Sequence, residues 1–388
     1  MKLKPQHGAT FLVAGTSIGA GMLALPVSTA QVGFFPSMGI LILAWYSMYL
    51  AALLLLEVTL CFPSGTNMIT MATACFGRWG KAITWTVYLL LLYVLNAAYL
   101  SALTALFTSW LPMTLPTGVI PMVIVLVFAS TLYIGPRFLD GCNRILMLGM
   151  LVSFLAVVLS FSGAPMHALT AQGSVVGLAT AIPVVVTAFG FHIIIPSLRS
   201  YVAEDVESIR SALWWGSIIP LMVYLLWQYL VFSTLPSNGQ SGLLALWHTG
   251  DVAALITLLG STLHSTYFAY YIDAFSWFII ATSFLGVSLS LVDFLSDGLS
   301  TTRYARHRLS GVLCALLPPF LVVLSHQQGF FTILRYAGAL VVFLLCGLPA
   351  AMALHCRRQG PTRAWVHSRE MVWLAVFSFI VVVSEFLH

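Results

Sequence analysis

Eleven apolar runs, each of roughly 18 residues or more, follow one another along this chain and limit its fold more strongly than any other feature. They lie near residues 8–31, 36–62, 82–110, 117–134, 143–163, 174–198, 209–235, 268–297, 309–325, 329–355 and 370–387. Lipid satisfies no backbone hydrogen bonds, so such runs cross a bilayer as helices. A hydrophobic content of 60% and a mean hydropathy of +0.99 agree with this class. The sequence therefore predicts an all-α, polytopic membrane protein with 11 transmembrane helices in a single domain, residues 1–388.

The basic residues indicate the topology. All of the 16 Lys and Arg residues except Arg335 fall on the side of the N-terminus. They are Lys2, Lys4, Arg78, Lys81, Arg137, Arg144, Arg199, Arg210, Arg303, Arg306, Arg308, Arg357, Arg358, Arg363 and Arg369. Because positively charged loops stay in the cytoplasm, this alternation predicts a cytoplasmic N-terminus and, with an odd number of spans, an external C-terminus.

The first run, GATFLVAGTSIGAGMLALPVSTAQ, is interrupted by glycine near its midpoint. The interruption comprises Thr16, Ser17, Ile18, Gly19, Ala20 and Gly21. Irregular backbone at this depth is tolerated only where it is buried in protein or lines a cavity, which makes the segment a candidate binding site. The alternative is a kinked helix whose small residues allow close helix packing.

A second interrupted run, TAIPVVVTAFGFHIIIPSLRSYV, lies five spans later. Its break holds Thr187, Phe189, Gly190, Phe191 and His192. A second copy that begins five spans later starts from the opposite face, so the pair predicts a five-plus-five inverted repeat with broken helices 1 and 6. The repeats are expected at about 8–163 and 174–355, with an extra helix at about 370–387. Half-helix ends offer amide groups to a carboxylate and carbonyl groups to an ammonium or cation, which suits an amino acid.

Four motifs carry a family resemblance. They are GTSIGAGMLALP in the first run, LLLLEV with Glu57 in the second, TAFGFHIIIPSLRSY in the sixth and ATSFLGVSLSLVDF in the eighth. From about residue 8 to 387 the chain resembles the bacterial aromatic amino acid permeases, tyrosine-specific and tryptophan-specific, of the amino acid-polyamine-organocation superfamily. The resemblance implies H⁺-coupled import of an aromatic amino acid, tyrosine or tryptophan, across the bacterial inner membrane. A Na⁺-coupled or serine/threonine-selective symporter of the same fold is the alternative.

Several side chains are candidates for the substrate site. Phe189 and Phe191 flank the second break and are expected to form an apolar wall for an aromatic ring, although core packing is the alternative. Asn96 and Tyr99 lie three residues apart, hence on one helical face, and either reach the site together or make an interhelical hydrogen bond.

Ion coupling or gating is expected of the polar groups inside the spans, because intramembrane ionisable residues are costly and usually functional. Glu57 and Asp293 lie near cytoplasmic helix ends, as proton-relay groups or as snorkelling carboxylates. His192 lies deep in its span. Asp273 and Arg335 lie at similar depths near the outside, which predicts an ion pair between them. Thr282 and Ser283 offer hydroxyl oxygens for a Na⁺ cage unless they bond their own helix.

Other functional classes find little support. The chain carries no HExxH or GxSxG motif and no paired His/Cys spacing, so we expect neither an enzyme, a cofactor nor a bound metal. The scattered basic residues predict no nucleic-acid partner; the expected partners are an amino acid, H⁺ or Na⁺, and the lipid bilayer. An external loop at 236–265, helical near 251–263, is either a lid or a plain surface loop.

Overall fold

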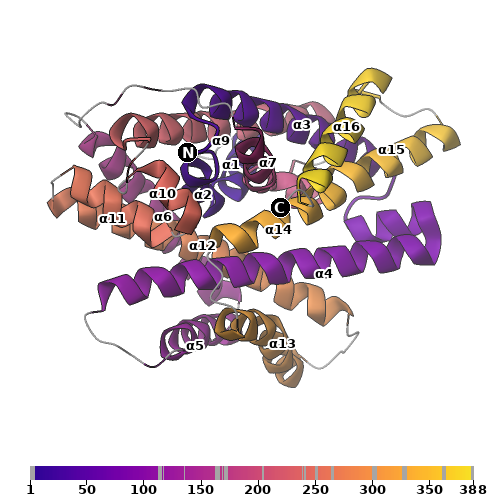
Figure 1. Ribbon diagram of the computed structural model, residues 1–388. Helices are drawn as coiled ribbons and strands as arrows, with labels where there is room; N and C mark the ends of the chain where they lie inside the picture. The colour runs from indigo at the N-terminus through magenta and orange to yellow at the C-terminus, as the bar shows by residue number, and fades with distance from the viewer. Residues whose placement is uncertain are drawn as a thin grey trace.

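The computed structural model describes residues 5–111, 116, 118–134, 136–161, 167, 169, 174–202, 205–237, 239, 242–249, 252–263, 266–298, 304–325, 330–360 and 364–385. This part of the chain is all-helical (Figure 1). In chain order the helices are α1 Pro5–Ser17, α2 Gly21–Ser28, α3 Phe34–Leu60, α4 Met68–Trp110, α5 Val119–Ile134, α6 Pro136–Ser160, α7 Val175–Thr187, the 3₁₀ turn η1 Phe191–Ile194, α8 Ile195–Tyr201, α9 Val206–Thr234, α10 Leu243–Thr249, α11 Val252–Thr262, α12 Thr266–Gly298, α13 Tyr304–Ser325, α14 Phe330–Val342, the π-helical turn η2 Phe343–Gly347, α15 Leu348–Gln359 and α16 Ser368–Ser384.

The predicted class is confirmed, but the count of eleven spans is not. Within the described ranges, seven helices are long and apolar enough to cross a bilayer, or eight if α1 and α2 form one bent span. α5 and the apolar part of α13 are shorter than a usual spanning helix, and α16 has 17 residues. The eleven-helix topology therefore stays a prediction.

Both predicted breaks are present. α1 and α2 meet at an angle of 52° across residues 18–20. The second break separates α7 from η1 and α8, although Val176–Arg199 as a whole is still a continuous apolar span. A third irregularity, the π-helical turn η2 between α14 and α15, was not foreseen; such turns are rare inside helices.

The connection between the predicted second and third spans is largely helical. α4 begins at Met68, before the predicted span at 82–110, and the Asn67 side chain accepts a hydrogen bond from the Thr70 amide at its start. The helix is broken inside this segment at Gly77, whose φ of 63° is favourable only for glycine. The helical stretch expected near 251–263 is α11; Asp251 lies outside the described residues, as do Lys2, Lys4, Arg303 and Arg363.

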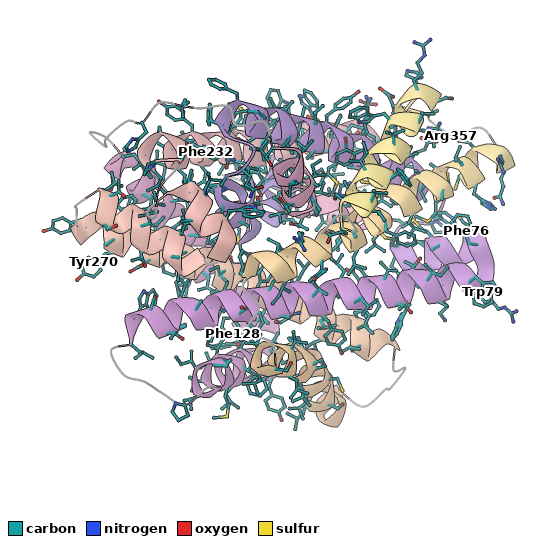
Figure 2. The ribbon with its side chains drawn as sticks, in the orientation of Figure 1. Phe76, Trp79, Phe128, Phe232, Tyr270 and Arg357 are labelled. Atoms are coloured by element: carbon teal, nitrogen blue, oxygen red, sulfur yellow. The ribbon has the colours of Figure 1, made fainter. Side chains whose placement is uncertain are left out.

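The arrangement places both broken helices inside the bundle. α4 crosses the whole molecule, with α5 and α13 on one side and α14 and α15 on the other (Figure 1). α1 packs on α9, and α2 packs on α7, so the two breaks face each other within a ring of complete helices. Figure 2 shows Trp79 and Arg357 at one end of the bundle and Phe232 and Tyr270 at the other. We call the first of these the basic end, because Arg78, Lys81, Arg199 and Arg357 lie there.

Candidate functional site

A cavity of ≈ 400 Å³ lies against both breaks. Its walls come from α1, α2, α4, α6, α7, η1, α12, α14 and η2. Of the predicted site residues, those that line it are Thr16, Ser17, Ile18, Gly19, Gly21, Tyr99, Gly190, Thr282 and Ser283. This volume is within the range of small-molecule sites, so the cavity is the natural place for a substrate.

The first break turns its amide end to this cavity. α2 begins at Gly21, and no side chain caps its first turn. Gly19 and Gly21 line the cavity, whereas Ala20 is fully buried and donates its amide to Ser283 Oγ at 3.0 Å. The Met22 and Leu23 amides already bond the Gly19 and Ala20 carbonyls at 3.0 and 3.1 Å, so among the described residues the amides of Gly19 and Gly21 are the ones left without a partner. With the positive end of the α2 dipole, they suit this wall to an anion such as a carboxylate.

The second break also lines the cavity. Its lining residues are Thr187, Ala188, Gly190, Ile193 and Ile194, whereas Phe189 and Phe191 are not among them. Both phenylalanines are fully buried: Phe189 packs on Tyr224 with ring centroids 5.2 Å apart, and Phe191 stacks on His192. The expected phenylalanine wall is therefore not formed in this conformation, because both rings pack against other parts of the protein.

The apolar wall comes from other helices. It consists of leucine and valine side chains with two methionines and one tyrosine: Leu91, Leu92, Leu95, Tyr99, Met147, Met150, Leu334, Val341 and Leu345. Tyr99 is the predicted member of this set, and its ring lies 6.3 Å from that of Phe330. Asn96 lies outside the cavity, since its amide donates to Leu92 O and its Oδ1 accepts from Ser288 at 2.6 Å. Of the two interpretations of Asn96, the interhelical hydrogen bond is the one observed.

Tyr224 on α9 joins the two breaks, and no pattern in the sequence pointed to this residue. Its hydroxyl lies 2.6 Å from the Ser17 carbonyl oxygen and 2.9 Å from that of Ala188. Gly21 also approaches the second break, since a Cβ added there would lie 3.5 Å from Ala188 Cα. The two interruptions thus touch at one buried point.

The hydroxyls proposed for a Na⁺ cage bond their own helix. Thr282 and Ser283 both donate to the Ile279 carbonyl at 2.9 Å. Ser283 is nevertheless beside the first break, as expected, because it accepts the Ala20 amide. His192 is fully buried and bonds the Met48 carbonyl through Nε2 at 2.9 Å. Since a carbonyl only accepts, Nε2 carries the proton and Nδ1 is left as a buried nitrogen without a partner among the described residues.

Glu57 has a partner that the sequence did not reveal. Arg357 on α15 binds both carboxylate oxygens at 2.6 Å, and Glu57 is only 1% exposed. The same guanidinium donates to the Val366 carbonyl at 2.9 Å, which connects α3 to the segment before α16. A bidentate pair of this kind combines two charge-assisted hydrogen bonds in a fixed geometry, so Glu57 is better suited to holding helices together than to relaying protons.

The predicted pair of Asp273 and Arg335 is wrong for this conformation. Arg335 Nε lies 3.7 Å from Oε2 of Glu385, the residue that follows α16, and the polar neighbour of Asp273 is the Trp110 side chain. Matched depth fixes the level of two side chains along the bundle but not the direction in which each points.

A second, larger hollow lies at the basic end. This vestibule of ≈ 1120 Å³ is lined by residues 65–70, Arg78, Lys81 and the predicted candidate Asp293, among others. It shares the wall residues Ile193 and Ser290 with the central cavity, so the two hollows adjoin each other. The vestibule therefore lies next to the central cavity on the side of the basic end.

The comparisons with known proteins cover nearly the whole chain. The model of the tryptophan/tyrosine permease family matches residues 3–387. The tyrosine-specific transport system 1 of Haemophilus influenzae is 33% identical over 383 residues, which are 96% of this chain and 94% of that protein. The tryptophan-specific transport protein of the same organism is 29% identical over 92% of this chain and 89% of its own.

Two further matches bear on specificity and fold. Glutamine transporter 2 of Aliivibrio fischeri is 28% identical over 91% of this chain and 89% of that protein. A crystal structure of a mutant manganese transporter from Eremococcus coleocola superimposes with a TM-score of 0.60 at 16% identity, over 98% of this chain and 85% of that one. At this identity the structural match concerns the fold alone.

Proposed function

This chain belongs to the tryptophan/tyrosine permease family, whose named members are transport proteins and not enzymes, and from that premise we propose that it imports tyrosine or tryptophan together with H⁺. The family and the apolar helices make it a multi-pass membrane protein. We place it in the bacterial inner membrane, with the N-terminus in the cytoplasm and the C-terminus outside.

The observation that carries the proposal is the uncapped N-terminus of α2 on the wall of the central cavity. An amino acid carboxylate bound there would receive hydrogen bonds from the Gly19 and Gly21 amides and the favourable end of the helix dipole. Glycine at positions 19 and 21 keeps side chains out of the way of such an approach. We therefore assign the carboxylate to the segment from Ser17 to Gly21.

An aromatic side chain fits the opposite wall. The leucine, valine and methionine side chains of α4, α6, α14 and η2 bury apolar area, and Tyr99 offers a ring for edge or offset contact. Phe189 and Phe191 support this wall from behind the break in the present conformation. The polar end and the apolar end of an aromatic amino acid thus have separate partners.

The topology that we propose has eleven spans and a five-plus-five inverted repeat. Each predicted span corresponds to a described helix or to a broken set of helices, including the shorter α5, α13 and α16. The two broken helices are five spans apart and meet at their breaks, as expected of two copies inserted from opposite faces. The positive-inside rule assigns the basic end to the cytoplasm, and we infer that the cavity and its adjoining vestibule belong to an inward-facing state.

Proton coupling requires a group whose proton affinity differs between the two transport states. His192 is the strongest candidate because Nδ1 is an unpartnered basic nitrogen inside the second break, and Asp293 in the vestibule is the next. Glu57 is a weaker candidate, since Arg357 holds both of its oxygens.

Proteoliposomes test this function directly. An inward pH gradient in Na⁺-free choline buffer should drive accumulation of labelled tyrosine or tryptophan, and unlabelled serine and glutamine should compete poorly. His192→Gln should keep exchange and lose accumulation, because exchange needs no net proton movement. Uptake that requires Na⁺ and ignores the pH gradient would instead support the Na⁺-coupled alternative, and efficient competition by glutamine or serine would refute the aromatic assignment.

A further inference from the structure

Two half-helices end at the same point inside the bundle. α1 ends at Ser17, and Ala188 follows the last residue of α7. Where a helix stops, its last carbonyl groups lack partners in a following turn and carry the negative end of the helix dipole. Both ends meet at Tyr224, whose hydroxyl is 2.6 Å from Ser17 O and 2.9 Å from Ala188 O.

Converging carbonyl groups of this kind normally attract a cation. Broken transporter helices use freed carbonyls and half-helix C-termini to hold a coupling ion, and hard cations prefer such oxygen ligands. Here a neutral donor stands between them, with one hydroxyl proton shared by two acceptors. Tyr224 is fully buried, so its hydroxyl is shielded from competing solvent, and its ring is held edge-on against Phe189 at 5.2 Å and 64°.

The hydroxyl sits where the two breaks meet. Gly21, at the start of α2, lies against Ala188, so the amide end that we assign to the substrate and the carbonyl ends that Tyr224 holds are neighbours. A shift of either half-helix lengthens one of the two hydrogen bonds. The position of the substrate site therefore depends on Tyr224 even though Tyr224 is not among the residues that line the cavity.

We propose that Tyr224 is a positioning residue whose hydroxyl takes the place of a metal cation between the two breaks, holds them in binding geometry and makes substrate binding independent of Na⁺. This inference rests on the proposed function and deepens it, because it supplies a structural reason for H⁺ rather than Na⁺ as the coupling ion. The neighbouring Ser283 oxygen is also engaged by protein groups, accepting from Ala20 and donating to Ile279.

The test is Tyr224→Phe, which removes the hydroxyl and keeps the ring. Tyr229→Phe is the matched control, since Tyr229 lies on the same helix, is 37% exposed and packs by its ring against Phe34. Binding of labelled tyrosine and tryptophan to the purified protein is measured in choline, sodium and lithium chloride. Wild type and Tyr229→Phe should bind equally in all three salts.

Tyr224→Phe should bind about tenfold or more weakly in choline, because two buried carbonyls lose their donor. Sodium or lithium should restore part of this loss, since a small cation can then occupy the position between the two oxygens. A purely structural role predicts no such salt effect. Unchanged binding in choline, or a loss that neither cation relieves, would overturn the proposal.

Wild type provides a second measurement if the variant does not fold. A ligand that binds only the folded state raises the unfolding midpoint, so a resident cation site would make the midpoint higher in about 100 mM sodium or lithium chloride than in choline chloride. We expect equal midpoints, and a clear rise with either cation would overturn the inference. Failure of wild type to bind either aromatic amino acid in any salt would instead refute the proposed function.

Discussion

In the first broken helix the axis bends by 52° between α1 and α2, whereas in the second the residues from Val176 to Arg199 still form one apolar span. The bend leaves the N-terminus of α2 uncapped on the cavity wall. Tyr224 holds both breaks, at Ser17 and at Ala188, and the second break is tied further by the bond of His192 to Met48. The same glycine signal thus marks the wall that we assign to the substrate carboxylate in one helix and a more firmly held junction in the other.

This anchoring continues on the C-terminal side of the second break. Arg199 on α8 donates to the Thr59 and Phe62 carbonyls at 2.7 and 2.6 Å, at the C-terminal end of α3. A cation at a helix C-terminus is favourable both through these bonds and through the helix dipole. The C-terminal half of the second broken helix, α8, is therefore fixed to α3. Substitutions in the two breaks should accordingly have different consequences.

The largest effect should follow from filling the first break. A Cβ at position 19 would lie 2.8 Å from Ser283 Oγ and displace it from the Ala20 amide, and one at position 21 would contact Ala188. Gly19→Val and Gly21→Val should weaken tyrosine or tryptophan binding about 100-fold or more. Radioligand binding checks this, with gel filtration to monitor folding.

Gly39→Val is the control for that experiment, because Gly39 is also helical and no atom lies within 4 Å of an added Cβ. It should bind like wild type. Undiminished binding in both Gly19→Val and Gly21→Val would show that the carboxylate does not approach the first break.

A smaller effect should separate the cavity wall from the packing behind it. Tyr99→Leu should weaken tryptophan binding about tenfold and leave serine, if it binds, nearly unchanged, because an aromatic contact is lost. Phe189→Leu should instead lower the free energy of unfolding by about 1 kcal/mol. It should leave the preference for tryptophan over serine unchanged. Competition binding and thermal unfolding measure the two quantities; a larger change of preference in Phe189→Leu would restore the original assignment of that residue.

These positions show what the sequence can and cannot predict. The helix positions and both breaks follow from local patterns, because periodicity, glycine and charge act within a few turns. The long-range interaction partners of individual side chains do not follow from such patterns. Glu57 and Arg357 are 300 residues apart, and Tyr224 is one of 14 tyrosines whose importance arises only when segments 207 and 36 residues away are packed against it. For Arg335, depth along the helix was known, but the direction that selects Glu385 over Asp273 was not.

The anchoring of the second broken helix predicts a loss of stability rather than of specificity. Arg199→Gln should lower the free energy of unfolding by about 2 kcal/mol, because two hydrogen bonds from a charged donor disappear. Arg369→Gln, which changes an exposed arginine on α16, should cost much less. Chemical unfolding followed by tryptophan fluorescence provides the measurement, and equal losses in both variants would contradict the anchoring role.

The smallest effect should come from Gly190→Ala in the second break. The backbone there has a φ of −81°, which any residue adopts, and the nearest atom to an added Cβ is the Thr187 oxygen at 3.3 Å. Binding should stay within about threefold of wild type. A loss as severe as that expected for Gly21→Val would remove the difference between the two breaks.

The adjacency of cavity and vestibule has a pharmacological consequence. We expect an aromatic amino acid that carries a bulky extension on its ring to enter from the basic end, with the extension in the larger hollow, and to leave no room for the helices to close around it. Such a compound should act as a sided inhibitor. Applied to the face that bears Arg78 and Lys81 it should trap the carrier and stop exchange, and applied only to the opposite face of a sealed vesicle it should compete far less effectively.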